Sequence, residues 1–352
     1  MKKPFLTAKT AFFSVLFFVF ASAFQGAFAQ DEHAADSTTT EVASEKEGFN
    51  ASEVILHHVM DDHVWHFFDG HYGTLYLPII VYSAERGLDV FSSGNFYDEH
   101  HNIVEYNGYK LEHNHIYLSD SGKAVLDLSI TKNVAMLFIN AALLLLVFLS
   151  VAKGAKQNSG KAPEGVQSFF EPIIIFVRDE IVKPNIGHHY EKFLPYLLTL
   201  FFFILFGNLL GLLPGAANLT GNIAVTFVLA FLTFLITNVS GNKGYWGHIF
   251  WTPGVPLPLR IIILPVEIIG IFTKPFSLMI RLFVAITAGH IVILSLICLT
   301  FIFGSIWVGF GSTLITLFIN LIELLVAGIQ AYVFTMFSSL YIGMAVADHD
   351  HH

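Results

Sequence analysis

A single arginine, Arg281, lies in the middle of an apolar run that extends from about Leu259 to Phe303. Moving a charge to the centre of a bilayer costs about 2.5–3.5 kcal/mol on insertion scales, so a charge kept there indicates a function. An arginine that reaches the membrane surface or pairs for packing is the structural alternative. Because arginine keeps its proton, it can act as a fixed positive charge beside a path along which ions move.

Other polar side chains are spaced so that a helix would align them with this arginine. Glu267, Lys274 and Arg281 are seven residues apart, and Glu323 and Gln330 repeat that spacing in the next apolar run. Seven residues are close to two helical turns, so each set forms one stripe on a continuous helix. The sequence therefore predicts two polar stripes in an apolar environment.

The two stripes can be matched if the helices form an antiparallel pair. With Arg281 level with Gln330, His290 lies about 13.5 Å and Glu323 about 10.5 Å further along in the same direction. An imidazole and a carboxyl group at one level can both change protonation state, as a proton relay requires. The structural alternative is a polar pair that only joins two helices, worth about 0.6 kcal/mol on average.

A second polar path is predicted on the other side of the arginine. Ser277, Lys274 and Glu267 lie there, toward the start of the same apolar run. A proton cannot readily pass a permanent cation, so Arg281 would separate two half-paths. This constellation favours an ion path over a packing role.

Composition places the chain in a membrane. Its 352 residues are 54% hydrophobic and only 13% charged, which is typical of an integral membrane protein. The formal net charge is −9, and the negative charge is concentrated in residues 30–130, which contain 18 acidic and four basic residues. No basic patch could neutralise phosphates, so we expect no nucleic-acid partner. We also expect no metal and no cofactor in the ion path, and Cys298 is expected to be a small core residue.

We expect an all-α polytopic membrane protein whose ion-channel domain covers residues 133–347. The last two apolar runs would be about 67 Å and 52 Å long as helices, whereas a hydrocarbon core is about 30 Å thick. We therefore expect them to form a strongly tilted antiparallel hairpin. Residues 166–187 mix charged and apolar residues and predict an interfacial hairpin instead of a span. Five spans are expected, at about 133–152, 193–213, 222–240, 259–303 and 312–346, before a cytoplasmic tail at 348–352.

The N-terminal third predicts an export signal and a small exported region. Residues 1–29 combine a basic start, a short apolar run and an Ala-x-Ala sequence, as secretory signal peptides do; an uncleaved first span is the alternative. Residues 30–132 are acidic and partly disordered by composition. Lysines follow the first and third spans, which places those loops in the cytoplasm and residues 30–132 outside it. A short helix is expected at 52–68, and strands are expected at 75–82, 88–91 and 108–111.

Two other functional hypotheses remain open at this point. His58, Asp62 and His66 would share one face of the expected short helix and could bind a metal, although a solvated polar face is the preferred interpretation. This leaves a membrane-anchored metal-binding protein as a third class. The main alternative is a secondary transporter with an intramembrane Arg–Glu pair, which inverted repeats would favour.

Several motifs resemble subunit a of the F-type ATP synthase membrane sector, over roughly residues 133–347. The resemblance implies that Arg281 faces the ion-binding carboxylates of a rotating c-ring, beside two long tilted helices. It also implies that His290 and Glu323 belong to the outer half-channel and that Gln330 is a partner of the arginine. The motifs are Glu267-x6-Lys274-Pro275-x-Ser277-x3-Arg281-Leu282-Phe283, Ala288-Gly289-His290, Glu323-x6-Gln330-Ala331-Tyr332-Val333-Phe334, Gly207-Asn208-x5-Pro214 and Thr220-x-Asn222-x3-Thr226, in which Asn208, Asn222 and Thr226 are supporting polar residues.

The same resemblance implies a role, a location and partners. The chain would be a non-catalytic stator subunit of a bacterial inner membrane, assembled with c-ring subunits, peripheral-stalk subunit b and the remaining ATP synthase subunits. Val284 and Ala285 depart from the pattern, because many bacterial members have asparagine there. Many members also place a carboxylate where His290 stands and a histidine where Glu323 stands. The exchange keeps one acid and one imidazole, so the relay chemistry is retained, and a proton suits this pair better than a hard cation does.

Overall fold

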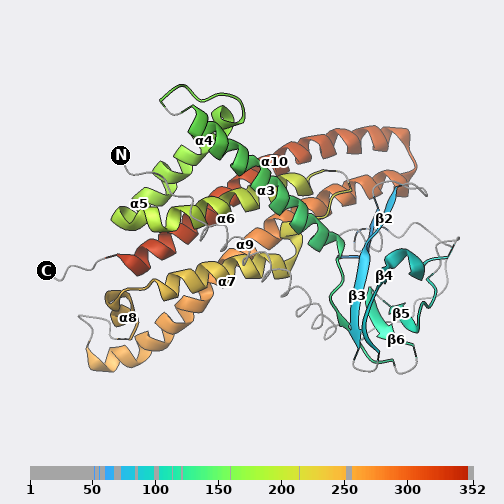
Figure 1. The fold of residues 1–352 in the computed structure, drawn as a ribbon, viewed down its shortest axis with the longest axis horizontal. Helices are drawn as coiled ribbons and strands as arrows, with labels where there is room; N and C mark the ends of the chain where they lie inside the picture. The colour runs from blue at the N-terminus through green and yellow to red at the C-terminus, as the bar shows by residue number, and fades with distance from the viewer. Residues whose placement is uncertain are drawn as a thin grey trace.

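The computed structural model combines a bundle of long helices with a small β region (Figure 1). It describes residues 51, 55, 60–66, 73–83, 86–98, 103–112, 114–119, 122–158, 160–213, 215–250 and 256–347. The predicted signal peptide, the acidic segment up to residue 50 and the predicted tail at 348–352 lie outside the described residues.

Within this part of the chain, four helical stretches are long and apolar enough to cross a membrane. A fifth is formed if α7 (Ile223–Val239) and α8 (Lys243–Phe250), which are bent by 100° relative to each other, count as one span. The mainly helical, polytopic architecture is therefore confirmed. The other predicted spans correspond to α3 (Lys132–Gln157), α6 (Tyr190–Gly211), α9 (Leu257–Phe303) and α10 (Ile306–Val346).

Residues 166–187, predicted as an interfacial hairpin, are mostly helical. α4 (Val166–Phe176), a π-helical segment (Val177–Val182) and α5 (Lys183–Ile186) follow one another without a break. A short turn at Gly187, with φ of 70°, leads into α6. The stretch Val166–Gly211 counts as one candidate span and contains α6, the span predicted at 193–213, so the interfacial position of residues 166–187 stays a prediction.

The charged side chains that suggested an interfacial segment neutralise one another. Asp179 accepts from Arg178 Nη2 at 2.8 Å and from Lys183 Nζ at 2.5 Å. A carboxylate between two cations lowers the cost of placing all three on an otherwise apolar helix. Spacing alone did not reveal this pairing.

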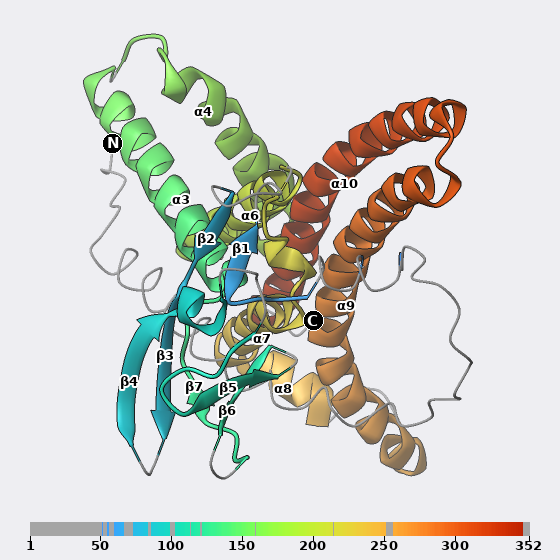
Figure 2. The same ribbon diagram turned by 90° about the vertical axis from the view of Figure 1, so that its right-hand side faces the viewer.

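α9 and α10 lie side by side as an antiparallel hairpin (Figure 2). Gly304 ends α9 in the left-handed conformation, with φ of 55°, which glycine adopts without steric cost. α9 continues through Pro265 and Pro275, so the helical continuity assumed for the polar stripe is present.

Contacts between these two helices follow one antiparallel register. Near the turn, Ser312 Oγ donates a hydrogen bond to the Leu296 carbonyl oxygen. Far from the turn, Lys274 Nζ lies 5.6 Å from the centre of the Tyr341 ring. Later residues of α9 therefore contact earlier residues of α10, as an antiparallel register requires.

The N-terminal region forms small antiparallel sheets beside the N-terminal end of α3. The strands predicted at 75–82, 88–91 and 108–111 are confirmed, except that Leu77 divides the first into two. Ile79 and Val81 of the central strand point into a small apolar core. The strands are β1 (Val64–His66) paired with β2 (Thr74–Tyr76), β3 (Pro78–Ser83) between β4 (Gly87–Ser92) and β7 (Leu126–Asp127), and β5 (Tyr109–Glu112) paired with β6 (His115–Leu118).

The helix predicted at 52–68 is wrong at its C-terminal end. Residues 51 and 55 are helical, but Val64 pairs with Tyr76 as part of β1. A β-branched residue followed by an aromatic one suits a strand, and pairing with β2 decides the conformation. Asp62 therefore does not share a helix face with His66, and His58 lies outside the described residues.

Candidate functional site

Arg281 lies half-buried on the face of α9 that packs against α10. Its guanidinium carbon lies 4.4 Å from the centre of the Phe337 ring, so the ring face supports the charge. Helical side chains lean toward the N-terminus of their own helix, so the arginine head reaches Phe337, further from the α9–α10 turn than Gln330 is. No carboxylate of the described residues forms an ion pair with it. The arginine is therefore a charge held in place by an aromatic ring.

Glu323 is the most buried carboxylate of the hairpin, with 4% of its surface exposed. Its side chain lies against Gly289 of α9, where an added Cβ would be 2.9 Å from Oε1. Oε2 is buried and has no hydrogen-bond partner among the described residues. A buried carboxylate oxygen without a partner is costly unless it binds a proton or a passing group.

His290 and Gln330 occupy neighbouring positions on the same two helices. His290 directly follows Gly289, so the close approach of Glu323 to that glycine brings the imidazole and the carboxyl group to one level. Gln330 is half-buried on α10, between Glu323 and Phe337. The predicted register thus places an acid and an imidazole beyond the arginine, toward the α9–α10 turn.

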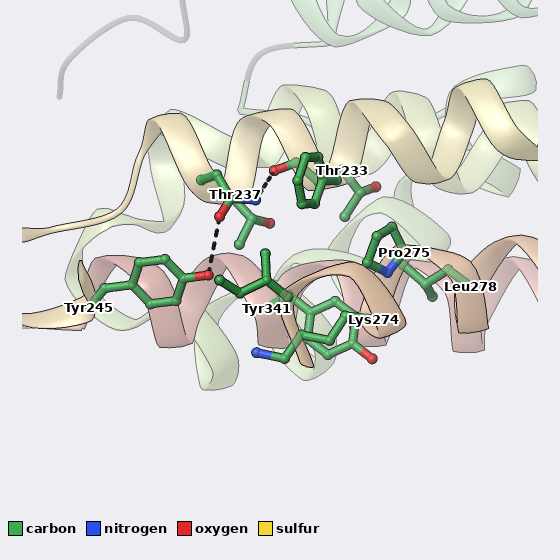
Figure 3. A pocket seen from close by; sticks show the side chains of 10 residues that line it. Thr233, Thr237, Tyr245, Lys274, Pro275, Leu278 and Tyr341 are labelled. Carbon is green, nitrogen blue, oxygen red and sulfur yellow. Dashed lines mark hydrogen bonds between the residues drawn. The ribbon is translucent and has the colours of Figure 1, made fainter. Parts of the chain in front are cut away.

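The other predicted path lies toward the start of α9. Glu267, Lys274 and Ser277 are all half-buried there. A pocket opens at this level between α7, α8, α9 and α10, and Lys274 and Tyr341 line it (Figure 3). The site can therefore present polar groups on both sides of Arg281.

Sequence reasoning did not identify the polar side chains that α7 and α8 add to this pocket. Tyr245 Oη donates to Asn238 Oδ1 at 3.4 Å, and both residues line the pocket. Thr237 Oγ1 is buried there and has no partner within the described part of the chain. Only the sharp bend between α7 and α8 brings Tyr245 to α9, and no spacing rule predicts such a bend.

Of the supporting polar residues, Asn208 hydrogen-bonds to α10. Its Nδ2 donates to the Ala327 carbonyl oxygen at 3.2 Å, and Thr220 Oγ1 donates to Asn208 Oδ1 at 2.6 Å. Asn222 accepts from the Ala224 backbone N–H and caps α7. Thr226, in the first turn of α7, donates to a carbonyl of the preceding turn. Asn222 and Thr226 therefore support the start of α7.

The suggested metal site has no structural counterpart in the part of the chain that can be described. No group of three His, Cys, Asp or Glu side chains suited to a metal ion occurs among these residues. Asp62 is buried, and its Oδ1 accepts from the Val64 backbone N–H.

Comparison with known families gives two matches along the chain. A family model described as ATP synthase A chain matches residues 134–343. A second model, described only as a domain of unknown function, matches residues 54–137.

Three curated relatives are similar over most of their length. ATP synthase subunit a 2 of Chlorobaculum tepidum is 48% identical over 261 residues, which cover 72% of this chain and 73% of the relative. ATP synthase subunit a of Chloroherpeton thalassium is 48% identical over 231 residues, or 64% of this chain and 69% of the relative. ATP synthase subunit a 2 of Prosthecochloris aestuarii is 42% identical over 333 residues, or 92% of this chain and 89% of the relative, so the similarity includes the N-terminal region.

Proposed function

Because this chain belongs to the ATP synthase subunit a family, and so is a stator component of the F-type membrane sector, we propose that it passes protons through two half-channels separated by Arg281. The chain itself is non-catalytic and couples the proton gradient to ATP synthesis elsewhere in the complex. Family membership gives no support to the alternative of a secondary transporter.

The observation that carries this proposal is the setting of Glu323. A buried carboxyl group, one of whose oxygens has no hydrogen-bond partner among the described residues, lies against Gly289, next to His290. Such a pair can exchange a proton without a large movement of either helix. His290 and Glu323 therefore form the outer relay, and Gln330 lies between this relay and the level of the arginine head.

The inner half-channel starts at the pocket around Lys274. Glu267, Lys274 and Ser277 supply its polar stripe, and Tyr245 and Asn238 extend it toward the cytoplasm. A proton that reaches Arg281 from either side meets a cation that cannot release its own proton. It must therefore leave through a carboxylate of the neighbouring c-ring.

The partners and the topology follow from the same role. α9 and α10 expose rows of large apolar side chains, among them Val284 and Leu325, which suit contact with c-ring helices and lipid. Peripheral-stalk subunit b and the other ATP synthase subunits complete the assembly in the bacterial inner membrane. Residues 1–29 act as a signal peptide, the N-terminal region is periplasmic, and the C-terminus is cytoplasmic.

Replacing Arg281 tests the function directly. Arg281→Ala is expected to abolish ATP-driven proton pumping and proton-driven synthesis, because protons could then pass between the half-channels without ring rotation. Arg281→Lys is expected to be nearly as inactive, since a desolvated lysine can lose its proton. Pumping is measured in vesicles that contain purified, fully assembled enzyme, with Lys153→Ala on the exposed end of α3 as a control. Normal coupled pumping by assembled Arg281→Ala enzyme would overturn the proposal.

A further inference from the structure

The N-terminal region shares its hydrophobic core with the membrane helices. Trp65 of β1 is 6% exposed and Leu77 is 5% exposed. Both belong to the apolar core that also includes Ala217 and Leu219 of the turn between α6 and α7. Trp65 Nε1 also donates to the Gly215 carbonyl oxygen at 2.6 Å. The N-terminal region therefore packs against the α6–α7 turn, in addition to its covalent connection to α3.

A line of buried hydrogen bonds continues from this turn to α10. Thr220, five residues after Gly215, donates to Asn208 Oδ1, and Asn208 Nδ2 donates to the Ala327 carbonyl oxygen. Thr220 and Asn208 are both buried. Ala327 lies one helical turn after Glu323 on α10. The contact made by Trp65 is thus connected, through the backbone of residues 215–220 and the two hydrogen bonds of Asn208, to the helical turn that bears the proposed relay carboxyl.

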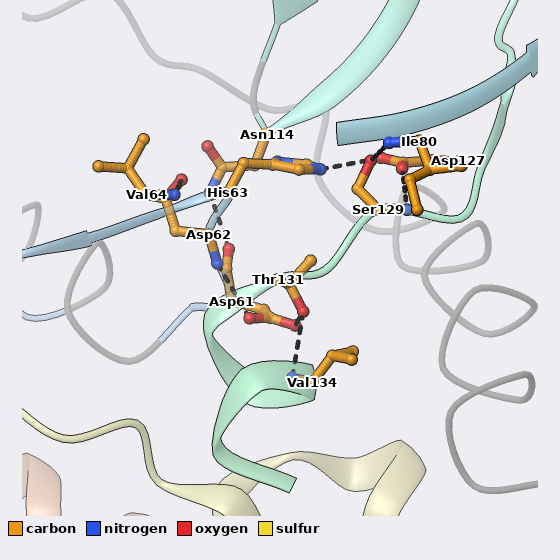
Figure 4. Close-up of polar contacts among 10 residues, drawn as sticks. All are labelled: Asp61, Asp62, His63, Val64, Ile80, Asn114, Asp127, Ser129, Thr131 and Val134. Atoms are coloured by element: carbon orange, nitrogen blue, oxygen red, sulfur yellow. Dashed lines mark hydrogen bonds and ion pairs between the residues drawn. The ribbon is translucent and has the colours of Figure 1, made fainter. Parts of the chain in front are cut away.

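The base of β1 is fixed to the start of α3 by two hydrogen bonds to the Asp61 carboxyl group, of which Figure 4 shows the one from Thr131. Asp61 Oδ2 accepts from Thr131 Oγ1 at 2.8 Å, and Oδ1 accepts from the Asn133 backbone N–H at 3.1 Å. The Lys132 N–H donates to the Asp62 carbonyl oxygen at 2.9 Å. Trp65 of β1 follows Asp61 by four residues, so the hydrogen bonds of Asp61 and Asp62 to α3 fix the position from which Trp65 contacts Gly215.

We propose that the N-terminal region is a positioning element of the outer half-channel, in which Trp65 fixes the α6–α7 turn and thereby the part of α10 that bears Glu323. This inference rests on the proposed role of Glu323 in proton transfer. Trp65 is a positioning residue, because it acts through Gly215, Thr220 and Asn208 and does not touch the proton path. The consequence is that the region of unknown function sets the geometry of the relay.

The test is the dependence of proton flux on external pH, measured in vesicles that contain the complete complex. Trp65→Phe keeps the aromatic packing and removes the Nε1 donor. We expect equal amounts of assembled complex but a lower flux, with the midpoint of the pH profile shifted by about half a pH unit, the size set by one net hydrogen bond. A matched control is Trp307→Phe, because Trp307 is 82% exposed at the start of α10. Its pH profile is expected to stay unchanged.

Two further variants separate the possible outcomes. Thr220→Val removes the hydrogen bond from Thr220 to Asn208, which lies between Gly215 and α10. The double variant Trp65→Phe/Thr220→Val should therefore shift the midpoint little more than either single variant. An unchanged midpoint in Trp65→Phe, or strictly additive shifts in the double variant, would overturn the positioning role. Glu323→Gln serves as a check on the premise. If it leaves flux intact, the proposed relay fails, whereas loss of flux in Glu323→Gln with a normal Trp65→Phe profile refutes the positioning inference alone.

Discussion

At the scale of single residues, the pair formed by His290 and Glu323 makes the sharpest prediction. If the two side chains form one relay, the proton belongs to the pair and to neither residue alone. Replacing either by alanine should lower proton flux by roughly tenfold or more, and replacing both should add little. The exchange His290→Glu with Glu323→His should restore part of the flux, because it returns one acid and one imidazole to the same level.

The measurement is proton flux in reconstituted vesicles, normalised to assembled complex. Glu323→Gln separates proton transfer from packing, since the amide keeps the shape and hydrogen-bonding capacity of the side chain but cannot carry a proton. Additive losses in the single variants, with no recovery in the exchange, would show that the residues act separately.

At the scale of elements, the packing of α5 on α10 depends on Gly343. A Cβ at this position would collide with the backbone carbonyl of Asn185, which cannot rotate away. Asn185 Nδ2 also donates to Ser339 Oγ at 2.8 Å across the same contact. Gly343→Ala is therefore expected to destabilise the subunit by about 1–3 kcal/mol, the usual cost of overpacking.

Gly328→Ala, on the same helix, is the matched control for this prediction, because no atom of the described residues lies within 4 Å of an added Cβ there. Alanine favours a helix over glycine by up to ~1 kcal/mol, so this control should be neutral or slightly stabilising. The readout is the fraction of subunit retained in purified complex after heating. Equal retention of the two variants would contradict the assigned packing.

Helical spacing explains why the pairing of α9 with α10 could be predicted from sequence, whereas the ion path itself stays a prediction. The rise per residue is nearly constant, so the register of α9 and α10 followed once Arg281 was set level with Gln330. The strand at Val64 could not be predicted in the same way, because its conformation depends on pairing with Tyr76, which is distant in sequence. Tyr245 was missed for a related reason, since only the bend before α8 brings it to Lys274.

At the scale of the whole molecule, the pH outside the membrane should govern how firmly the N-terminal region is attached. His63 Nε2 and Asp127 Oδ2 are 2.9 Å apart, and Asp61 and Asp62 also lie near the imidazole. Burial lowers the pKa of His63, but the hydrogen bond and charge of Asp127 outweigh it and raise that pKa above 6.5. Burial opposes ionisation of Asp127, yet His63 holds its pKa below 3.8.

The raised pKa of His63 and the lowered pKa of Asp127 determine how attachment of the N-terminal region changes with pH. The His63 contribution is complete below about pH 6.5 and is lost as pH rises through its raised pKa, whereas the Asp127 contribution is lost as pH falls below about 3.8. Asp61 has a pKa raised mainly by burial, which also favours attachment at lower pH. Backbone hydrogen exchange of β1 in the intact complex, corrected for intrinsic rates, should be slower at pH 6 than at pH 9. In His63→Asn this difference should shrink, and an undiminished difference would exclude the His63–Asp127 pair as its source.

The hydrogen bond from Trp65 to Gly215 also imposes an order on synthesis. The two residues are 150 positions apart, so at roughly 5–20 residues per second the ribosome produces Gly215 about 8–30 seconds after Trp65. During that interval α3 and α6 must enter the bilayer, while Trp65 remains without the surface that later covers it. The N-terminal region therefore completes its burial only after the α6–α7 turn has reached the same side of the membrane, which makes its compact form a late product of insertion.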